Sequence, residues 1–191
     1  TESKNDGYAR LRKDVLRPLR RRLDMVETRL TERDYASIDY SKVPSKAMSK
    51  YVKAFRKNDG ERHSQFLESV KQGKTNVKGG RLYPHDIVKQ ICTEIYTNKD
   101  EKSVTQLELQ WEDMIRENVN IAALKKTVVV SDVSASMTGL PMDMSVALGV
   151  LIAGLAQEPF HGYLITFSEN PEFHHVPKDV RLSDKLISVK N

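Results

Sequence analysis

The segment from Val128 to Met137 constrains the fold of this chain more than any other, because three valines are followed at once by alternating polar residues. The valines show no helical period and predict a short strand buried on both faces, as in the middle of a parallel sheet. After a Gly-Leu-Pro turn, the apolar segment from Met142 to Gln157 predicts a largely buried helix, and Tyr163 to Phe167 predicts a second strand. Strand, helix and strand over this length predict a βαβ-like unit of an open α/β sheet. A short antiparallel strand is expected at Pro171 to Val176.

Asp132, Ser134 and Ser136 occupy alternate positions where the first predicted strand ends. Alternate residues of such a loop can turn toward one point, at the carboxyl end of the sheet where open α/β folds bind ligands. One carboxylate and two hydroxyls form an all-oxygen set that suits Mg²⁺, which keeps several of its waters. The alternative is that these residues only cap the following helix or form a turn, since Asp and Ser are favoured in both roles.

This Asp132-x-Ser134-x-Ser136 spacing after a valine-rich strand resembles the metal-ion-dependent adhesion site of von Willebrand factor type A (vWA) domains. The resemblance implies metal ligation by these three residues. Ala135 stands where the family usually has Gly. In vWA domains a Thr and an Asp from two later loops complete the site, and both would lie beyond residue 191. The chain is therefore expected to be truncated within the vWA domain, and to bind Mg²⁺ weakly or not at all.

Charge and periodicity both change near Lys125. Residues 1–125 hold 26 of the 31 Lys and Arg against 19 of the 26 Asp and Glu, a net charge of +7, whereas residues 126–191 carry −2. The predicted fold is mixed: an all-α helical module at residues 1–125, followed by the N-terminal portion of a doubly wound, Rossmann-like α/β domain of the vWA type at residues 126–191.

The basic helical module begins with a helix whose apolar residues recur every three or four positions, and Pro18 is expected to kink or divide it. Four arginines lie on this helix: Arg17, Arg20, Arg21 and Arg22. They predict contact with RNA phosphates, or alternatively only a solvated face. Further helices are predicted after Pro44, after the turn Asn58-Asp59-Gly60, after Pro84 and from a capping box at Ser103. Trp111, on the last of these helices, is expected to be a core residue.

A second resemblance covers most of the chain, from about Arg12 onward. The order of several short segments is similar to that in an uncharacterised plant family that pairs a helical module with a vWA domain. These segments include Tyr51-Val52-Lys53-Ala54-Phe55, Leu82-Tyr83-Pro84-His85-Asp86-Ile87, Gln110-Trp111 and Asp132-Val133-Ser134-Ala135-Ser136-Met137. The architecture resembles that of TROVE or Ro ribonucleoproteins, in which a helical ring binds RNA.

Several classes of protein are disfavoured. No apolar run is long enough for a membrane span, so no membrane partner is expected. The single cysteine, Cys92, excludes an internal disulfide and fits a reducing, cytoplasmic compartment. The chain lacks the motifs of serine hydrolases, phosphate-binding loops and zinc proteases. His174 and His175 are adjacent on a predicted strand, so their side chains should face opposite sides. The chain is therefore not expected to be an enzyme.

Two functions from different classes remain. The first is a non-enzymatic interaction module in which Asp132, Ser134 and Ser136 hold Mg²⁺ while an acidic group of a protein partner completes the metal shell. The second is RNA binding by the basic helical part, with the α/β part as a scaffold. Sensitivity to EDTA would indicate the first function, and a steep loss of affinity with salt would indicate the second.

Overall fold

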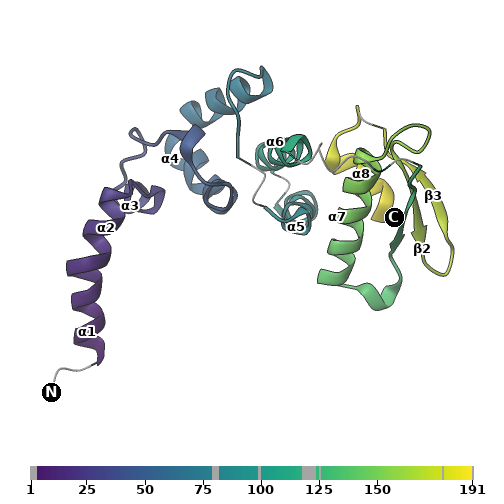
Figure 1. The fold of residues 1–191 in the computed structure, drawn as a ribbon. Helices are drawn as coiled ribbons and strands as arrows, with labels where there is room; N and C mark the ends of the chain where they lie inside the picture. Colours follow the sequence, from purple (N-terminus) through teal and green to yellow (C-terminus); the bar gives the residue numbers. More distant parts are fainter. Residues whose placement is uncertain are drawn as a thin grey trace.

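A computed structural model of the chain describes residues 4–78, 82–98, 100–117, 124, 126–177 and 179–190. The elements follow one another along an elongated molecule (Figure 1). A helical rod forms the N-terminal end, further helices form the middle, and a small sheet with its covering helices forms the other end. The mixed composition, helical first and α/β last, agrees with the sequence prediction.

The N-terminal rod, residues 4–22, is here called the arm. It consists of α1 (Lys4–Arg10), the π-helix η1 (Leu11–Leu16) and α2 (Arg17–Arg22), which follow one another without interruption. Pro18 does not divide the rod, since Leu16 and Arg17 before it keep helical φ and ψ and join η1 to α2. The chain turns instead at Asp24, whose φ is 47°, before α3 (Val26–Glu32).

The middle of the molecule is organised by α4 (Ser45–Lys71), which bends at Asp59, where φ is −147° and ψ is 39°. The predicted turn at this place is thus a kink within one long helix. The short 3₁₀-helix η2 (Tyr40–Lys42) packs into the bend. The ring of Tyr40 meets Phe55 edge to face at 5.2 Å, and its hydroxyl donates to the Asp59 carboxylate at 2.8 Å. A first hydrophobic core surrounds this contact, formed by Val26, Ile38, Tyr40, Val43, Met48, Phe55, Leu67, Val77 and Leu109.

Two further helices complete this half: α5 (Pro84–Thr93), extended by the π-helix η3 (Glu94–Asn98), and α6 (Glu101–Glu117). The predicted start of α6 at Ser103 was wrong. Asp100 caps the helix, because its carboxylate accepts the Ser103 N–H at 3.3 Å and the Ser103 hydroxyl at 2.7 Å. The capping residue is therefore three positions earlier than the sequence pattern indicated.

The sheet has the order β1-β2-β3. Strand β1 (Val129–Asp132) is parallel to β2 (Tyr163–Phe167), which is antiparallel to β3 (Glu172–His175). The helix α7 (Leu140–Leu155) connects the two parallel strands, so the predicted βαβ unit and the antiparallel third strand are confirmed.

The expectation that β1 is buried on both faces was wrong. It is an edge strand, and α7 covers one of its faces while Val130 on the other face is 59% exposed. The helix α7 is likewise buried on one side only, since Met144 and Leu148 point outward. A run of apolar residues cannot distinguish a strand covered on both faces from one covered on a single face.

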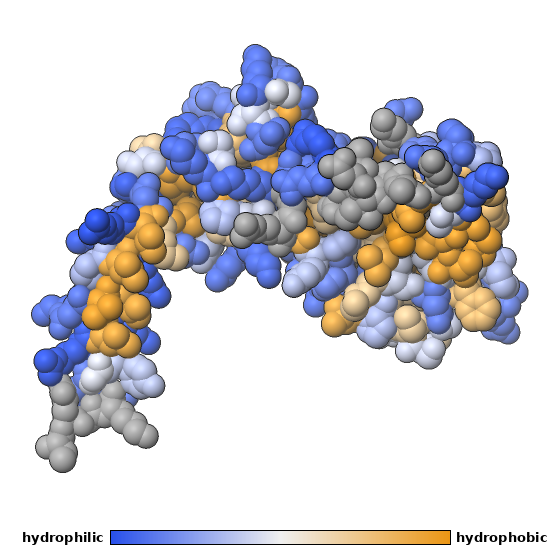
Figure 2. All heavy atoms as spheres, in the orientation of Figure 1, coloured by the Kyte–Doolittle hydropathy of each residue, from blue (hydrophilic) through white to orange (hydrophobic). Residues whose placement is uncertain are grey.

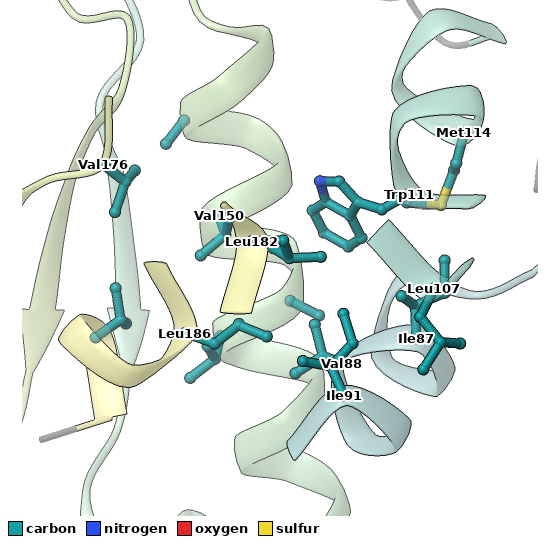
Figure 3. Packing of buried hydrophobic residues seen from close by; sticks show 14 of the residues in the cluster. Ile87, Val88, Ile91, Leu107, Trp111, Met114, Val150, Val176, Leu182 and Leu186 are labelled. Carbon is teal, nitrogen blue, oxygen red and sulfur yellow. The ribbon is translucent and has the colours of Figure 1, made fainter. Parts of the chain in front are cut away.

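A second hydrophobic core joins the helical half to the sheet (Figure 3). Trp111 of α6, 4% exposed, and Ile91 of α5 meet the inner face of α7. A helix that the sequence did not predict, α8 (Leu182–Lys190), adds Leu182 and Leu186 to this core. The Glu108 carboxylate on α6 fixes the start of α8 by accepting the Ser183 hydroxyl at 2.8 Å. One core therefore spans both sides of the predicted boundary at Lys125, a residue that itself lies outside the described ranges.

Candidate functional site

The loop that follows β1 brings together the three residues predicted to bind a metal. Asp132 ends the strand, and the 3₁₀-helix η5 (Ala135–Met137) forms one turn directly after Ser134. The hydroxyl oxygens of Ser134 and Ser136 lie 3.0 Å apart, and the Asp132 carboxylate accepts the Ser134 N–H at 2.9 Å. Asp132 and Ser134 are half-buried and Ser136 is exposed, so the group is open to solvent. We call these three residues the Asp132 loop.

Hydrogen bonds keep the carboxylate of the Asp132 loop ionised. The hydroxyl of Ser134, and then its backbone N–H, lower the pKa of Asp132 below the ordinary value for aspartate. Hydrogen bonds to the charged form favour that form, and an ionised carboxylate is the form that binds a metal ion. The structure thus supplies one full negative charge and two neutral hydroxyls on a single turn.

The position of the Asp132 loop depends on a close approach between β1 and α7. The buried side chain of Ser131 donates to the backbone oxygen of Ser145 at 3.2 Å and faces Gly149, which leaves room for it. On the other side, the Val133 N–H donates to the Phe167 oxygen at 2.9 Å and ties the loop to β2. The loop is therefore held from two directions by ordered elements.

A cavity of about 260 Å³, lined by both polar and apolar side chains, lies beside the loop, and the sequence reasoning missed it. Val133 forms one wall, and the hairpin of β2 and β3 supplies polar side chains. Within it the Thr166 hydroxyl lies 3.0 Å from His174 Nε2. A pattern in the sequence could have indicated this cavity, because the polar lining residues occupy every second position: Thr166, Ser168, Asn170, Glu172 and His174.

The two adjacent histidines face opposite sides of β3, as predicted. His174 turns to Thr166 and the cavity, whereas the His175 ring stacks on Tyr163 with a centroid distance of 4.4 Å. Within the described ranges, no three side chains of His, Cys, Asp or Glu lie close enough together to hold a metal ion. The Asp132 loop itself supplies one carboxylate, that of Asp132.

The four residues predicted to contact RNA lie on α2, in the N-terminal rod at the other end of the molecule from the sheet (Figure 1): Arg17, Arg20, Arg21 and Arg22. All four side chains are exposed, and Arg21 forms an ion pair with Glu32 at 2.9 Å. The arginines and the Asp132 loop are thus separate sites. None of the helices in the described ranges combines the length and apolar character of a membrane span.

Comparison with known proteins places the chain among domains without an assigned activity. One family, a domain of unknown function (DUF2828), matches residues 2–123, and a second domain of unknown function (DUF7788) matches residues 126–191. The chain is similar to the "Uncharacterized protein L728" of Acanthamoeba polyphaga mimivirus, with 33% identity over 177 residues. The similarity covers 85% of this chain, but the chain spans only 30% of the length of the viral protein.

No solved structure matches the chain. Neither family description mentions a vWA or TROVE module, so both of those resemblances remain expectations. Because the first match covers more than half of the sequence, the chain belongs to the DUF2828 family.

Proposed function

We propose that the Asp132 loop is a metal-dependent protein-interaction site of the vWA type. The observation that carries the proposal is that Asp132 ends a parallel strand at its carboxyl end and that Ser134 and Ser136 lie in the turn directly after it. This is the edge of an open α/β sheet where ligands bind.

The chemistry of the three residues fits Mg²⁺. Neighbouring ligands of an octahedral Mg²⁺, each about 2.1 Å from the ion, lie roughly 3 Å from one another. The two serine hydroxyl oxygens are 3.0 Å apart, which agrees with neighbouring positions in such an octahedron. Asp132, with its lowered pKa, would supply the charge. Because only one ligand is charged, we expect the affinity of this chain for Mg²⁺ to be low.

A bound Mg²⁺ would keep positions that a partner's carboxylate can occupy. The chain's own residues would then hold and orient the ion, and the partner would contribute the negative charge that the Asp132 loop lacks. The geometry supports binding rather than catalysis. In the described part of the chain, Ser134 and Ser136 bond to each other, and neither hydroxyl is bonded to a histidine that could act as a base.

Calorimetric titration of the chain with Mg²⁺ tests the proposal. Asp132→Asn should abolish the weak heat of binding, and Ser134→Ala should reduce it. Asp184→Asn is a control for the loss of one carboxylate, because the exposed Asp184 lies on α8 and not in the loop. An immobilised acidic peptide should retain the chain in Mg²⁺ and release it in EDTA. Unchanged Mg²⁺ binding by Asp132→Asn would refute the proposal.

RNA binding by the basic helical part stays a prediction. The exposure of the four arginines meets the first requirement of that function. Exposed arginines alone do not distinguish RNA from other polyanions. The arm that carries these arginines also has an apolar side, and phosphate binding does not explain why that side is apolar.

A further inference from the structure

The apolar residues of the arm are uncovered. No residue of η1 or α2 is buried. The stripe consists of four side chains of the arm and of Leu23 directly after it, each 45% to 64% exposed: Tyr8, Leu11, Val15, Leu19 and Leu23. Figure 2 shows a continuous band of hydrophobic residues along the rod, which extends away from the rest of the molecule. The sequence pattern of an amphipathic helix is therefore present without the core that such a face normally covers.

The π-helix in the arm keeps this stripe straight. From Leu11 to Leu23 the apolar residues recur at intervals of four, and in a regular α-helix of 3.6 residues per turn such a row drifts around the axis. The π-helix η1 has more residues per turn than an α-helix, so residues four apart within it shift around the axis in the opposite direction, which offsets the drift over residues 11–16. The apolar side chains thus stay on one side along the arm, whose 19 residues span about 28 Å.

The charge of the arm limits what can cover the stripe. Residues 4–22 contain eight basic and two acidic residues, a net charge of +6. A second copy of the arm laid against the stripe would bring together two sets of positive charge, which disfavours a symmetric arm-to-arm dimer. The covering partner must instead be anionic.

Two arginines flank the stripe. Arg12 is about one helical turn from Tyr8, and Arg22 is one turn from Leu19. In a contact with a protein helix these guanidinium groups would be buried, which costs free energy unless each is paired. At a lipid surface the same side chains extend to the headgroups while their methylene groups cover apolar surface. The arm also projects from the rest of the protein, so a flat surface could contact the stripe along its full length.

We propose that the arm lies in the surface of an anionic membrane, with the stripe among the acyl chains and the arginines at the headgroups. A helix of this kind lies parallel to the bilayer and does not span it. The sequence argument against a membrane partner concerned spanning segments only, so it does not apply to a helix that lies in the surface. The proposal is independent of the Asp132 loop.

Co-sedimentation of the full chain with vesicles tests this proposal. The chain should bind vesicles of phosphatidylcholine with phosphatidylserine, and vesicles of pure phosphatidylcholine much less. Leu11→Gln with Leu19→Gln should reduce the affinity at least about tenfold, since two apolar anchors are lost. Arg20→Gln, Arg21→Gln and Arg22→Gln together should reduce it roughly a hundredfold, at about fivefold per charge. Gln retains the helical propensity of Leu and Arg, so the arm should stay helical.

Matched controls exist for both sets. Leu148→Gln removes an equally exposed leucine of α7, 45% exposed like Leu11, and should leave vesicle binding unchanged. Lys50→Gln, Lys57→Gln and Lys71→Gln remove three exposed charges from α4 and should weaken binding far less than the arginine variant.

Three results would overturn the proposal. The first is vesicle binding that the leucine variant retains in full, because the contact would then be purely electrostatic. The second is binding of single-stranded RNA, with loss in the arginine variant but not in the leucine variant, by a chain that ignores vesicles. The third is a concentration-dependent dimer without lipid that the leucine variant abolishes, which would show that a second copy covers the stripe.

Discussion

Replacing Gly149 by alanine should destabilise the protein by about 1–2 kcal/mol, although alanine is the better helix former. A Cβ at this position would lie 2.0 Å from the hydroxyl oxygen and 3.3 Å from the Cβ of Ser131. Ser131 must then rotate away and lose its bond to the Ser145 oxygen, or α7 must move off β1. A lost buried hydrogen bond or an overpacked contact costs about 1–3 kcal/mol. The helical preference for alanine offsets up to about 1 kcal/mol of that.

Urea unfolding of three variants beside the unchanged protein measures this effect. Gly154→Ala is the matched control on the same helix, where a new Cβ meets nothing within 4 Å, and it should be neutral or stabilising by up to about 1 kcal/mol. Adding Ser131→Ala to Gly149→Ala removes the atom at 2.0 Å and should restore most of the loss. Equal stability of Gly149→Ala and Gly154→Ala would refute the close approach of α7 to β1, and with it the account of how the Asp132 loop is held.

Two further predictions concern single residues of the helical half. Burial lowers the pKa of His63 below its ordinary value of 6.5, so below that pH the unfolded chain binds more protons than the folded one. The contribution of His63 to stability should be constant above about pH 6.5 and should fall below it by at most about 1.4 kcal/mol per pH unit. His63→Gln should reduce this fall, as measured by urea unfolding midpoints from neutral to acid pH. Asp100→Ala should lower the free energy of unfolding by about 1–2 kcal/mol, since it removes the cap of α6 and the ion pair with Arg56. Asp100→Asn keeps a capping oxygen and should lower it less. Equal losses of stability in thermal unfolding would contradict the assigned cap.

The buried hydrogen bonds around His63 determine which of its ring nitrogens carries the proton. Its Nε2 lies 2.8 Å from the Gln106 side-chain oxygen, and the Gln106 amide nitrogen donates to the Met48 oxygen at 3.0 Å. Because the oxygen of Gln106 can only accept, a neutral His63 must carry its proton on Nε2. A second proton would place a charge in the core between α4 and α6, which is why burial lowers the pKa.

The parts of the fold that the sequence predicted are those set by local chemistry. Pro84 begins a helix, Gly73 ends one with φ of 69°, and the uncharged run at 163–167 forms a strand, because each depends on residues next to one another. The three residues of the Asp132 loop converge as expected for the same reason. Trp111 lies in the core, as its position on an amphipathic helix predicted.

The parts that the sequence did not predict depend on which surfaces meet. The valines of β1 predicted a central strand, yet the strand lies at an edge of the described sheet. The residues of a strand do not determine by themselves how many neighbouring strands it has. The stripe of the arm has the period of a buried face and is uncovered. Helix α8 has a weakly amphipathic sequence and is fixed mainly by distant partners, above all by Glu108, which lies 75 residues before Ser183. Only the folded chain brings these partners together.

The shared core also determines how the two candidate functions must be tested. Cutting the chain at residue 125 would separate Trp111 and Ile91 from α7 and would expose, on the other fragment, Val146 and Val150. Each such side chain contributes about 1.5–3 kcal/mol when buried, so four of them already approach the whole stability of a typical domain. A fragment of residues 1–125 would therefore expose an apolar surface of its own and bind vesicles or aggregate nonspecifically. Substitutions on the arm within the intact chain avoid this, because their targets have no buried partners, and a loss of binding can then be assigned to the arm alone.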